Sequence, residues 1–130
     1  MKSVTLCASN RFSKQAESFI AELRKHGVVV YSPHFYTANY GGLAKVEGHN
    51  KKFIAMGLTL DHFSKIRRGD VVFIYNEDGY SGNSVTLEIG FATALDKPIY
   101  ALSNKDEEAC RDILFAGYAA TPEELIQVLQ

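Results

Sequence analysis

Residues 71–84 read VVFIYNEDGYSGNS, and this stretch decides the fold. The first five residues form a continuous β-branched and aromatic run, which is typical of a strand buried on both faces of a parallel sheet. The next nine residues are polar and rich in glycine, and they lead into a helix that we predict over residues 83–96. A buried strand, a polar turn and a helix in this order indicate a parallel α/β sheet.

The rest of the chain repeats this alternation. Strands are predicted over residues 3–8, 28–31, 98–102 and 115–119, and helices over 13–26, 51–68, 106–114 and 122–129, the last with Thr121 as N-cap and Pro122 at its first position. Residues 34–49, which contain Gly41-Gly42, look irregular, and a loop of this length is usually functional or mobile. Because crossovers are right-handed, few topologies remain. We expect one domain over residues 1–130, a flavodoxin-like doubly wound parallel sheet of about five strands in the order 2-1-3-4-5.

Composition excludes several classes of function. The net charge is −1, and the basic pairs Lys51-Lys52 and Arg67-Arg68 fit a solvated helix face, so we do not expect a nucleic acid polymer as partner. The two cysteines form no C-x-x-C or Cys/His pattern, which argues against a metal site. No signal peptide is recognisable, and no apolar run reaches the roughly 20 residues of a membrane helix, so we expect a cytoplasmic protein without a membrane partner. The first strand is followed by neither a G-x-G-x-x-G nor a Walker loop, which disfavours a dinucleotide and nucleoside triphosphate hydrolysis.

The expected topology also locates a site. Ligands of open parallel sheets bind beyond the carboxyl ends of the strands at the switch point, which here lies between the first and third strands. The loops concerned are residues 9–11 and 76–84, and the second loop feeds a helix N-terminus, whose free N–H groups suit an anion. An alternative is that these residues only form turns and caps. The predicted binding residues are Ser9, Asn10, Arg11, Asn76, Gly82, Asn83 and Ser84.

Glu88 is the informative residue of the helix that follows. On a helical wheel it falls inside the apolar arc, between Ala92 and Leu95. A carboxylate on a buried stripe costs several kcal/mol unless something satisfies it, and near a helix start the dipole favours its ionised form. Such a group can act as a nucleophile or base, although a structural glutamate bonded to a backbone N–H or an arginine fits the pattern as well. The apolar arc consists of Val85, Ile89, Phe91, Ala92 and Leu95.

Several motifs together resemble one family. They are CASNR at 7–11, DHFSKIRRGD at 61–70, GYSGNSVTLEIGFA at 79–92 and KPI at 97–99. This set resembles the nucleoside 2-deoxyribosyltransferase superfamily, which includes 2'-deoxynucleoside 5'-phosphate N-hydrolases. The most specific part is EIGFA at 88–92 with KP at 97–98, and the match spans most of the chain.

The resemblance implies a flavodoxin-like fold and a homodimer or higher assembly. It also implies that Glu88 attacks C1' of the sugar to give a covalent glycosyl-enzyme, with no metal or organic cofactor. The family completes its site from a neighbouring subunit, and Asp112 takes the matching polar position. Asp112 could equally be an exposed helix residue without such a role. The chain departs from the family at Leu6, where a tyrosine is usual, and at His62, where an aspartate is usual. His62 either handles a proton of the base or is a helix-surface or capping histidine.

We therefore expect an enzyme that cleaves or transfers at the N-glycosidic bond of a nucleoside or nucleoside 5'-monophosphate. Ser9, Arg11 and the helix start at Ser84 suit a 5'-phosphate and favour a nucleotide hydrolase, with a nucleoside transferase as the close alternative. A non-catalytic nucleotide-binding or sensing domain of the same fold is the rival class, supported by the departures at Leu6 and His62. A purely structural subunit would leave the position of Glu88 unexplained.

Overall fold

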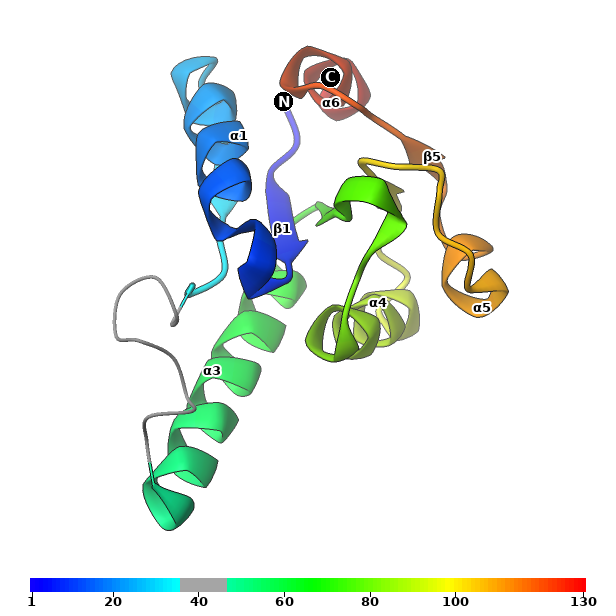
Figure 1. Cartoon of the computed structure of the whole chain (residues 1–130). Helices are drawn as coiled ribbons and strands as arrows, with labels where there is room; N and C mark the ends of the chain where they lie inside the picture. The colour runs from blue at the N-terminus through cyan, green and yellow to red at the C-terminus, as the bar shows by residue number, and fades with distance from the viewer. Residues whose placement is uncertain (36–46) are drawn as a thin grey trace.

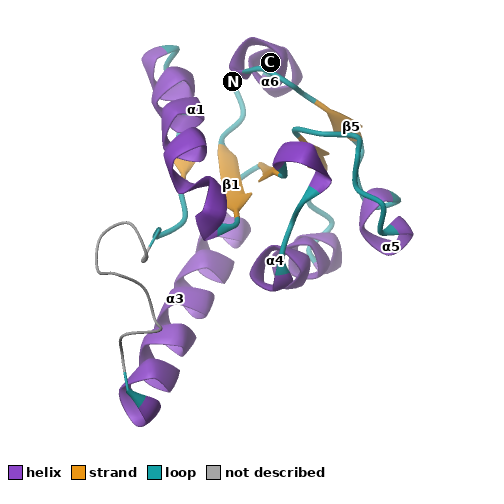
Figure 2. Cartoon of the chain, viewed as in Figure 1, coloured by secondary structure: helices purple, strands orange, loops and turns teal. Residues whose placement is uncertain are grey.

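The computed structural model describes residues 1–35 and 47–130. Five parallel strands form one sheet in the order β2-β1-β3-β4-β5, which confirms the flavodoxin-like order predicted from the sequence (Figures 1 and 2). The central pair is in register over its whole length, from Val4 opposite Val71 to Ala8 opposite Tyr75. The strands are β1 (Val4–Ala8), β2 (Val30–Tyr31), β3 (Val71–Tyr75), β4 (Ile99–Ala101) and β5 (Gly117–Tyr118).

Helices cover both faces of this sheet. In Figure 1, α1 and α6 lie on one side of β1, and α3 and α4 lie on the other. Because side chains alternate along a strand, β1 contributes Leu6 to the core beneath α1 and α6 and Cys7 to the core beneath α3 and α4. The helices are α1 (Ser13–Lys25), α3 (Gly48–Arg68), α4 (Asn83–Ala94), α5 (Ala109–Asp112) and α6 (Pro122–Leu129), with short 3₁₀ turns η1 (Asn10–Phe12) and η3 (Glu77–Gly79).

Element boundaries differ from the prediction where side chains cap the backbone. The helix predicted from residue 106 begins only at Ala109, because the Asp106 carboxylate accepts a hydrogen bond from the Glu108 N–H and the Glu108 carboxylate accepts one from the Cys110 N–H. The predicted cap at Thr121 is confirmed, since its hydroxyl accepts from the Glu124 N–H at 3.2 Å. Helix α3 begins at Gly48, whereas Gly41-Gly42 of the predicted irregular segment lie outside the described residues.

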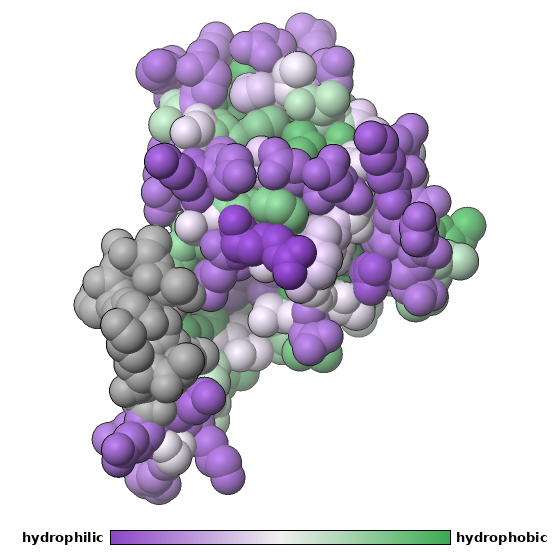
Figure 3. All heavy atoms as spheres, in the orientation of Figure 1, coloured by the Kyte–Doolittle hydropathy of each residue, from purple (hydrophilic) through white to green (hydrophobic). Residues whose placement is uncertain are grey.

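The visible surface is mostly polar, with apolar side chains at the edge formed by α5 (Figure 3). There Ile113, the residue that follows α5, is 81% exposed. Phe53, Met56 and Leu60 lie on one face of α3, at a spacing of three and four residues, and each is more than half exposed. We call these three residues the α3 ridge. Within the described residues, no helix is long and apolar enough to cross a membrane.

Candidate active site

A hollow of about 340 Å³ opens at the carboxyl ends of β1 and β3, where the sequence placed the switch point. Four parts of the chain form its wall: the end of β1 with the turn after it, the segment after β2, the middle of α3, and the β3–α4 loop with the first turns of α4. Of the residues predicted to form the site, those that line this hollow are Ser9, Asn10, His62, Gly82, Asn83, Ser84 and Glu88.

Glu88 reaches the hollow from the second turn of α4. Its neighbours Val85 and Ile89 are buried against the sheet, and this fixes the side of the helix that carries the carboxylate. The Glu88 side chain is 13% exposed, and burial raises its pKa from the ordinary 4.5 to about 7, which a hydrogen bond from the Cys7 thiol partly opposes. At neutral pH the carboxyl group therefore exchanges readily between its acid and its nucleophilic form.

Cys7 is the residue that sequence analysis missed. We matched the family's first-strand tyrosine to Leu6, which lies in the core beneath α1 and α6. Cys7 lies on the opposite face of β1, close to His62 and Glu88, which line the hollow. Its Sγ lies 3.3 Å from Nε2 of His62, and burial with the nearby Glu88 raises the pKa of the thiol well above its ordinary range. The thiol is therefore a neutral group next to Glu88.

His62 lies on α3 and is 5% exposed, so it is not the surface histidine that was one of the two readings. Burial and the charge of Lys65 lower its pKa to about 4, which keeps the imidazole neutral at physiological pH. Nε2 faces Glu88 at 3.9 Å, beyond hydrogen-bond distance, while Nδ1 is buried and has no hydrogen-bond partner among the described residues. His62 is among the residues that line the hollow, so a ligand there could contact it.

The N-terminus of α4 has the features of an anion site. Gly82 has φ +83, a conformation that L side chains rarely adopt. It precedes α4, and no cap side chain of its own bonds the first N–H groups of the helix, which are open to a ligand as far as the described part of the chain shows. Ser81 is 2% exposed and lines the hollow, and its hydroxyl has no hydrogen-bond partner within residues 1–35 and 47–130. Buried free donors at a helix N-terminus are suited to bind a phosphate or carboxylate.

Arg11 lies at the rim of the hollow. Its guanidinium carbon is 3.5 Å from the ring centroid of Tyr80, and the Tyr80 ring lines the hollow. Ser9 begins η1, and its hydroxyl accepts a hydrogen bond from the Arg11 N–H at 3.4 Å. Arg11 does not itself line the hollow, but it contacts Tyr80, which does.

Two predicted binding residues are placed elsewhere. The Asn76 amide donates to the Ser103 carbonyl at 3.1 Å and accepts from the Ser103 N–H at 2.9 Å, so it ties the β3–α4 loop to the loop after β4. Asp112 ends α5 and accepts a 2.6 Å hydrogen bond from the Tyr118 hydroxyl. Neither side chain lines the hollow of its own chain.

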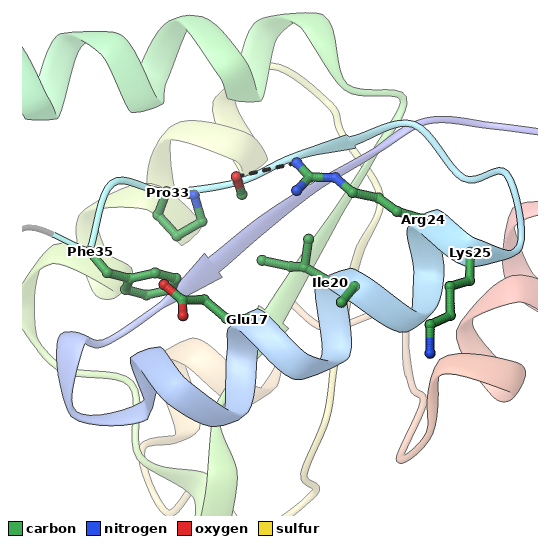
Figure 4. Close-up of a pocket in the computed structure, with 8 residues that line it drawn as sticks. Glu17, Ile20, Arg24, Lys25, Pro33 and Phe35 are labelled. Carbon is green, nitrogen blue, oxygen red and sulfur yellow. Dashed lines mark hydrogen bonds between the residues drawn. The ribbon is translucent and has the colours of Figure 1, made fainter. Parts of the chain in front are cut away.

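A second hollow, of about 740 Å³, lies between α1 and the segment after β2 (Figure 4). The two cations that line it are already engaged. Arg24 donates hydrogen bonds to the Val30 carbonyl at 3.0 Å and the Ser32 hydroxyl at 3.5 Å, and Lys25 pairs with Glu22 at 3.2 Å. This hollow adjoins Phe35, the last residue described before the gap. We therefore place the candidate active site in the hollow that contains Glu88.

Known structures share this fold. No protein-family model and no curated protein sequence matches the chain. A 2-deoxyribosyltransferase from Bacillus psychrosaccharolyticus superposes with a TM-score of 0.62 at 17% identity, over 95% of this chain and 89% of that one. A conserved protein from Enterococcus faecalis V583 superposes with a TM-score of 0.60 at 16% identity, over 98% and 96%. The chain therefore shares its fold with a 2-deoxyribosyltransferase.

Proposed function

We propose that this protein cleaves or transfers at the N-glycosidic bond of a nucleoside or nucleoside 5'-monophosphate. The observation that carries the proposal is the Glu88 carboxyl group, which is mostly buried and lines the hollow at the switch point of the sheet. The fold shared with a 2-deoxyribosyltransferase supports the same class of chemistry.

In this mechanism the ionised Glu88 attacks C1' of the sugar. A bond forms from the carboxylate oxygen to C1', and the bond from C1' to the base nitrogen breaks with its electron pair going to the base. Water, or a second base, then displaces Glu88 and regenerates the carboxylate. Because His62 is neutral, its role is to hydrogen-bond the base, and the leaving base takes its proton from solvent.

A 5'-phosphate would bind at the N-terminus of α4. Ser9, the Ser81 hydroxyl and the N–H groups of Asn83 and Ser84 offer donors there, and Arg11 adds a positive charge at the rim. This arrangement favours a nucleotide N-hydrolase over a nucleoside transferase, since a free nucleoside would leave these donors unpaired.

We also propose that the chain works as a homodimer. The α3 ridge, Leu87 on α4 and Ile113 at the end of α5 are exposed apolar side chains that a second copy could cover. In such a dimer Asp112, next to Ile113, would contribute to the partner's site, as the resemblance implies.

The test is a panel of nucleosides and their 5'-monophosphates, with the release of free base measured by chromatography. We expect base release by the wild type and a loss of several orders of magnitude in Glu88→Gln, which keeps the shape but lacks the nucleophile. Glu107→Gln, a change at an exposed glutamate, is the matched control and should keep full turnover. A folded Glu88→Gln variant with wild-type turnover would exclude the mechanism.

The alternative is a non-catalytic nucleotide-binding or sensing domain. It is favoured by the departures at Leu6 and His62, where the family has a tyrosine and an aspartate. Thermal stabilisation by a nucleotide without any base release from the whole panel would support this alternative instead.

A further inference from the structure

Three potential metal ligands converge at the inner end of the hollow. They are Sγ of Cys7 from β1, Nε2 of His62 from α3 and a carboxylate oxygen of Glu88 from α4, and all three atoms lie within 4.8 Å of one another. Within the described residues this is the one group of three such side chains. Each ligand comes from a different element of the fold, so the packing of α3 and α4 on β1 holds the group together.

The separations fit tetrahedral coordination. With zinc at about 2.3 Å from sulfur and about 2.0–2.1 Å from nitrogen and oxygen, the edges of a regular tetrahedron are about 3.6 Å for S···N and about 3.4 Å for N···O. Here Sγ of Cys7 is 3.3 Å from Nε2 of His62, and Nε2 is 3.9 Å from Oε1 of Glu88. Shifts of about half an ångström, within side-chain rotation, would bring the atoms to the ideal edges.

The charges and the donor types also match a particular class of ion. One thiolate, one carboxylate and one neutral imidazole balance the two charges of a divalent cation, which removes the cost of an uncompensated charge in a buried place. A thiolate with an imidazole selects zinc-like ions over magnesium or calcium. Glu88 and His62 line the hollow whereas Cys7 does not, so an ion would enter from the hollow and keep its fourth position open towards it.

We propose that Cys7, His62 and Glu88 bind a zinc-like divalent cation, and that the bound ion holds the protein inactive by occupying the Glu88 carboxylate. On binding, the Cys7 thiol loses its proton to solvent and forms the sulfur–metal bond, while His62 donates its Nε2 lone pair and Glu88 its oxygen. The binding stands on the geometry alone, and only its inhibitory consequence rests on the proposed function.

The test is a titration of the chelator-treated protein with Co²⁺, which reports its ligands by absorbance. We expect one ion per chain, tetrahedral bands in the visible range, a thiolate-to-cobalt band in the near ultraviolet, and displacement of cobalt by Zn²⁺. Cys110→Ser removes the other, exposed cysteine and is the matched control that should keep every band. Cys7→Ala should lose the thiolate band. His62→Gln should weaken cobalt binding by more than the roughly 10–100-fold that is typical when a residue that only hydrogen-bonds a metal ligand is replaced.

Cys7→Ser is the second variant if Cys7→Ala proves unstable, and far-ultraviolet circular dichroism establishes that each variant is folded. A thiolate band that persists without Cys7 but disappears in Cys110→Ser would overturn the site, and so would the absence of any tetrahedral cobalt spectrum. Because the titration contains no nucleoside, a metal site in a protein that shows no turnover even in its chelator-treated, metal-free form would defeat the proposed function and leave the site standing. Base release that persists with Zn²⁺ bound would defeat the inhibition.

Discussion

Replacing Glu88 by glutamine should change the way in which stability depends on pH. The pKa of Glu88 is raised from 4.5 to about 7 in the folded protein, so between these values the folded chain keeps a proton that the unfolded chain releases. Stability therefore falls as the pH rises through this window. At about 1.4 kcal/mol per pH unit, the total loss above pH 7 is about 3 kcal/mol.

Glu88→Gln cannot lose this proton, so it escapes the penalty. Below about pH 4 we expect a constant difference in the free energy of unfolding between the two proteins. By pH 8 the variant should be more stable than this difference predicts by about 3 kcal/mol, which is roughly 10 °C in melting temperature for a chain of this size. The measurement is urea denaturation from pH 4 to pH 8 in buffer with EDTA, which keeps the cluster free of metal. The exposed-site control Glu107→Gln should show no such divergence. A difference between wild type and Glu88→Gln that stays flat with pH would refute the buried, pKa-shifted carboxyl group.

Three further outcomes are expected. In competition binding, Arg11→Ala should lower the affinity for 5'-monophosphates more than the affinity for the matching nucleosides. An unchanged ratio of the two affinities would exclude Arg11 from phosphate recognition. Arg111→Met should lower the free energy of unfolding, measured by urea denaturation, by about 3–5 kcal/mol. The Asp106 side chain is 1% exposed and bonds Arg111 at 2.8 Å, so the substitution leaves a buried carboxylate without its cation. Adding Asp106→Leu to this variant should recover most of the loss. Light scattering at micromolar concentration should give a dimer that Ile113→Lys weakens, and a wild-type monomer would remove the role proposed for Asp112 in a partner's site.

The order of the sheet could be predicted because strands and helices differ in the spacing of their apolar residues, so each element can be recognised along the chain. The run at Val71–Tyr75 is buried throughout, and Thr121 with Pro122 marks the start of α6, so local patterns sufficed. Glu88 was also predictable, since a single carboxylate on an apolar helix face is a local anomaly.

The partners of Glu88 were not predictable in the same way. Leu6 and Cys7 both lie in a strand that is covered on each face, and apolar composition cannot say which of two neighbours faces a site. Cys7, His62 and Glu88 are also far apart in the chain, so the short ligand spacings that identify metal sites in sequences do not apply to them. Only the register of β1 and the packing of α3 against α4 bring the three together.

The β3–α4 loop has a consequence for the kinetics of binding. Gly79 has φ +84, and a Cβ there would lie 2.3 Å from the Lys105 carbonyl oxygen, while Asn76 bridges to Ser103 in the same neighbouring loop. The wall of the hollow that includes Ser81 and Gly82 is thus already ordered before any ligand arrives. Ordering a backbone costs about 1–2 kcal/mol per residue, and for this loop that cost is met during folding rather than on binding. Ligands should therefore associate with this wall in a single kinetic phase, without a slow step of loop closure.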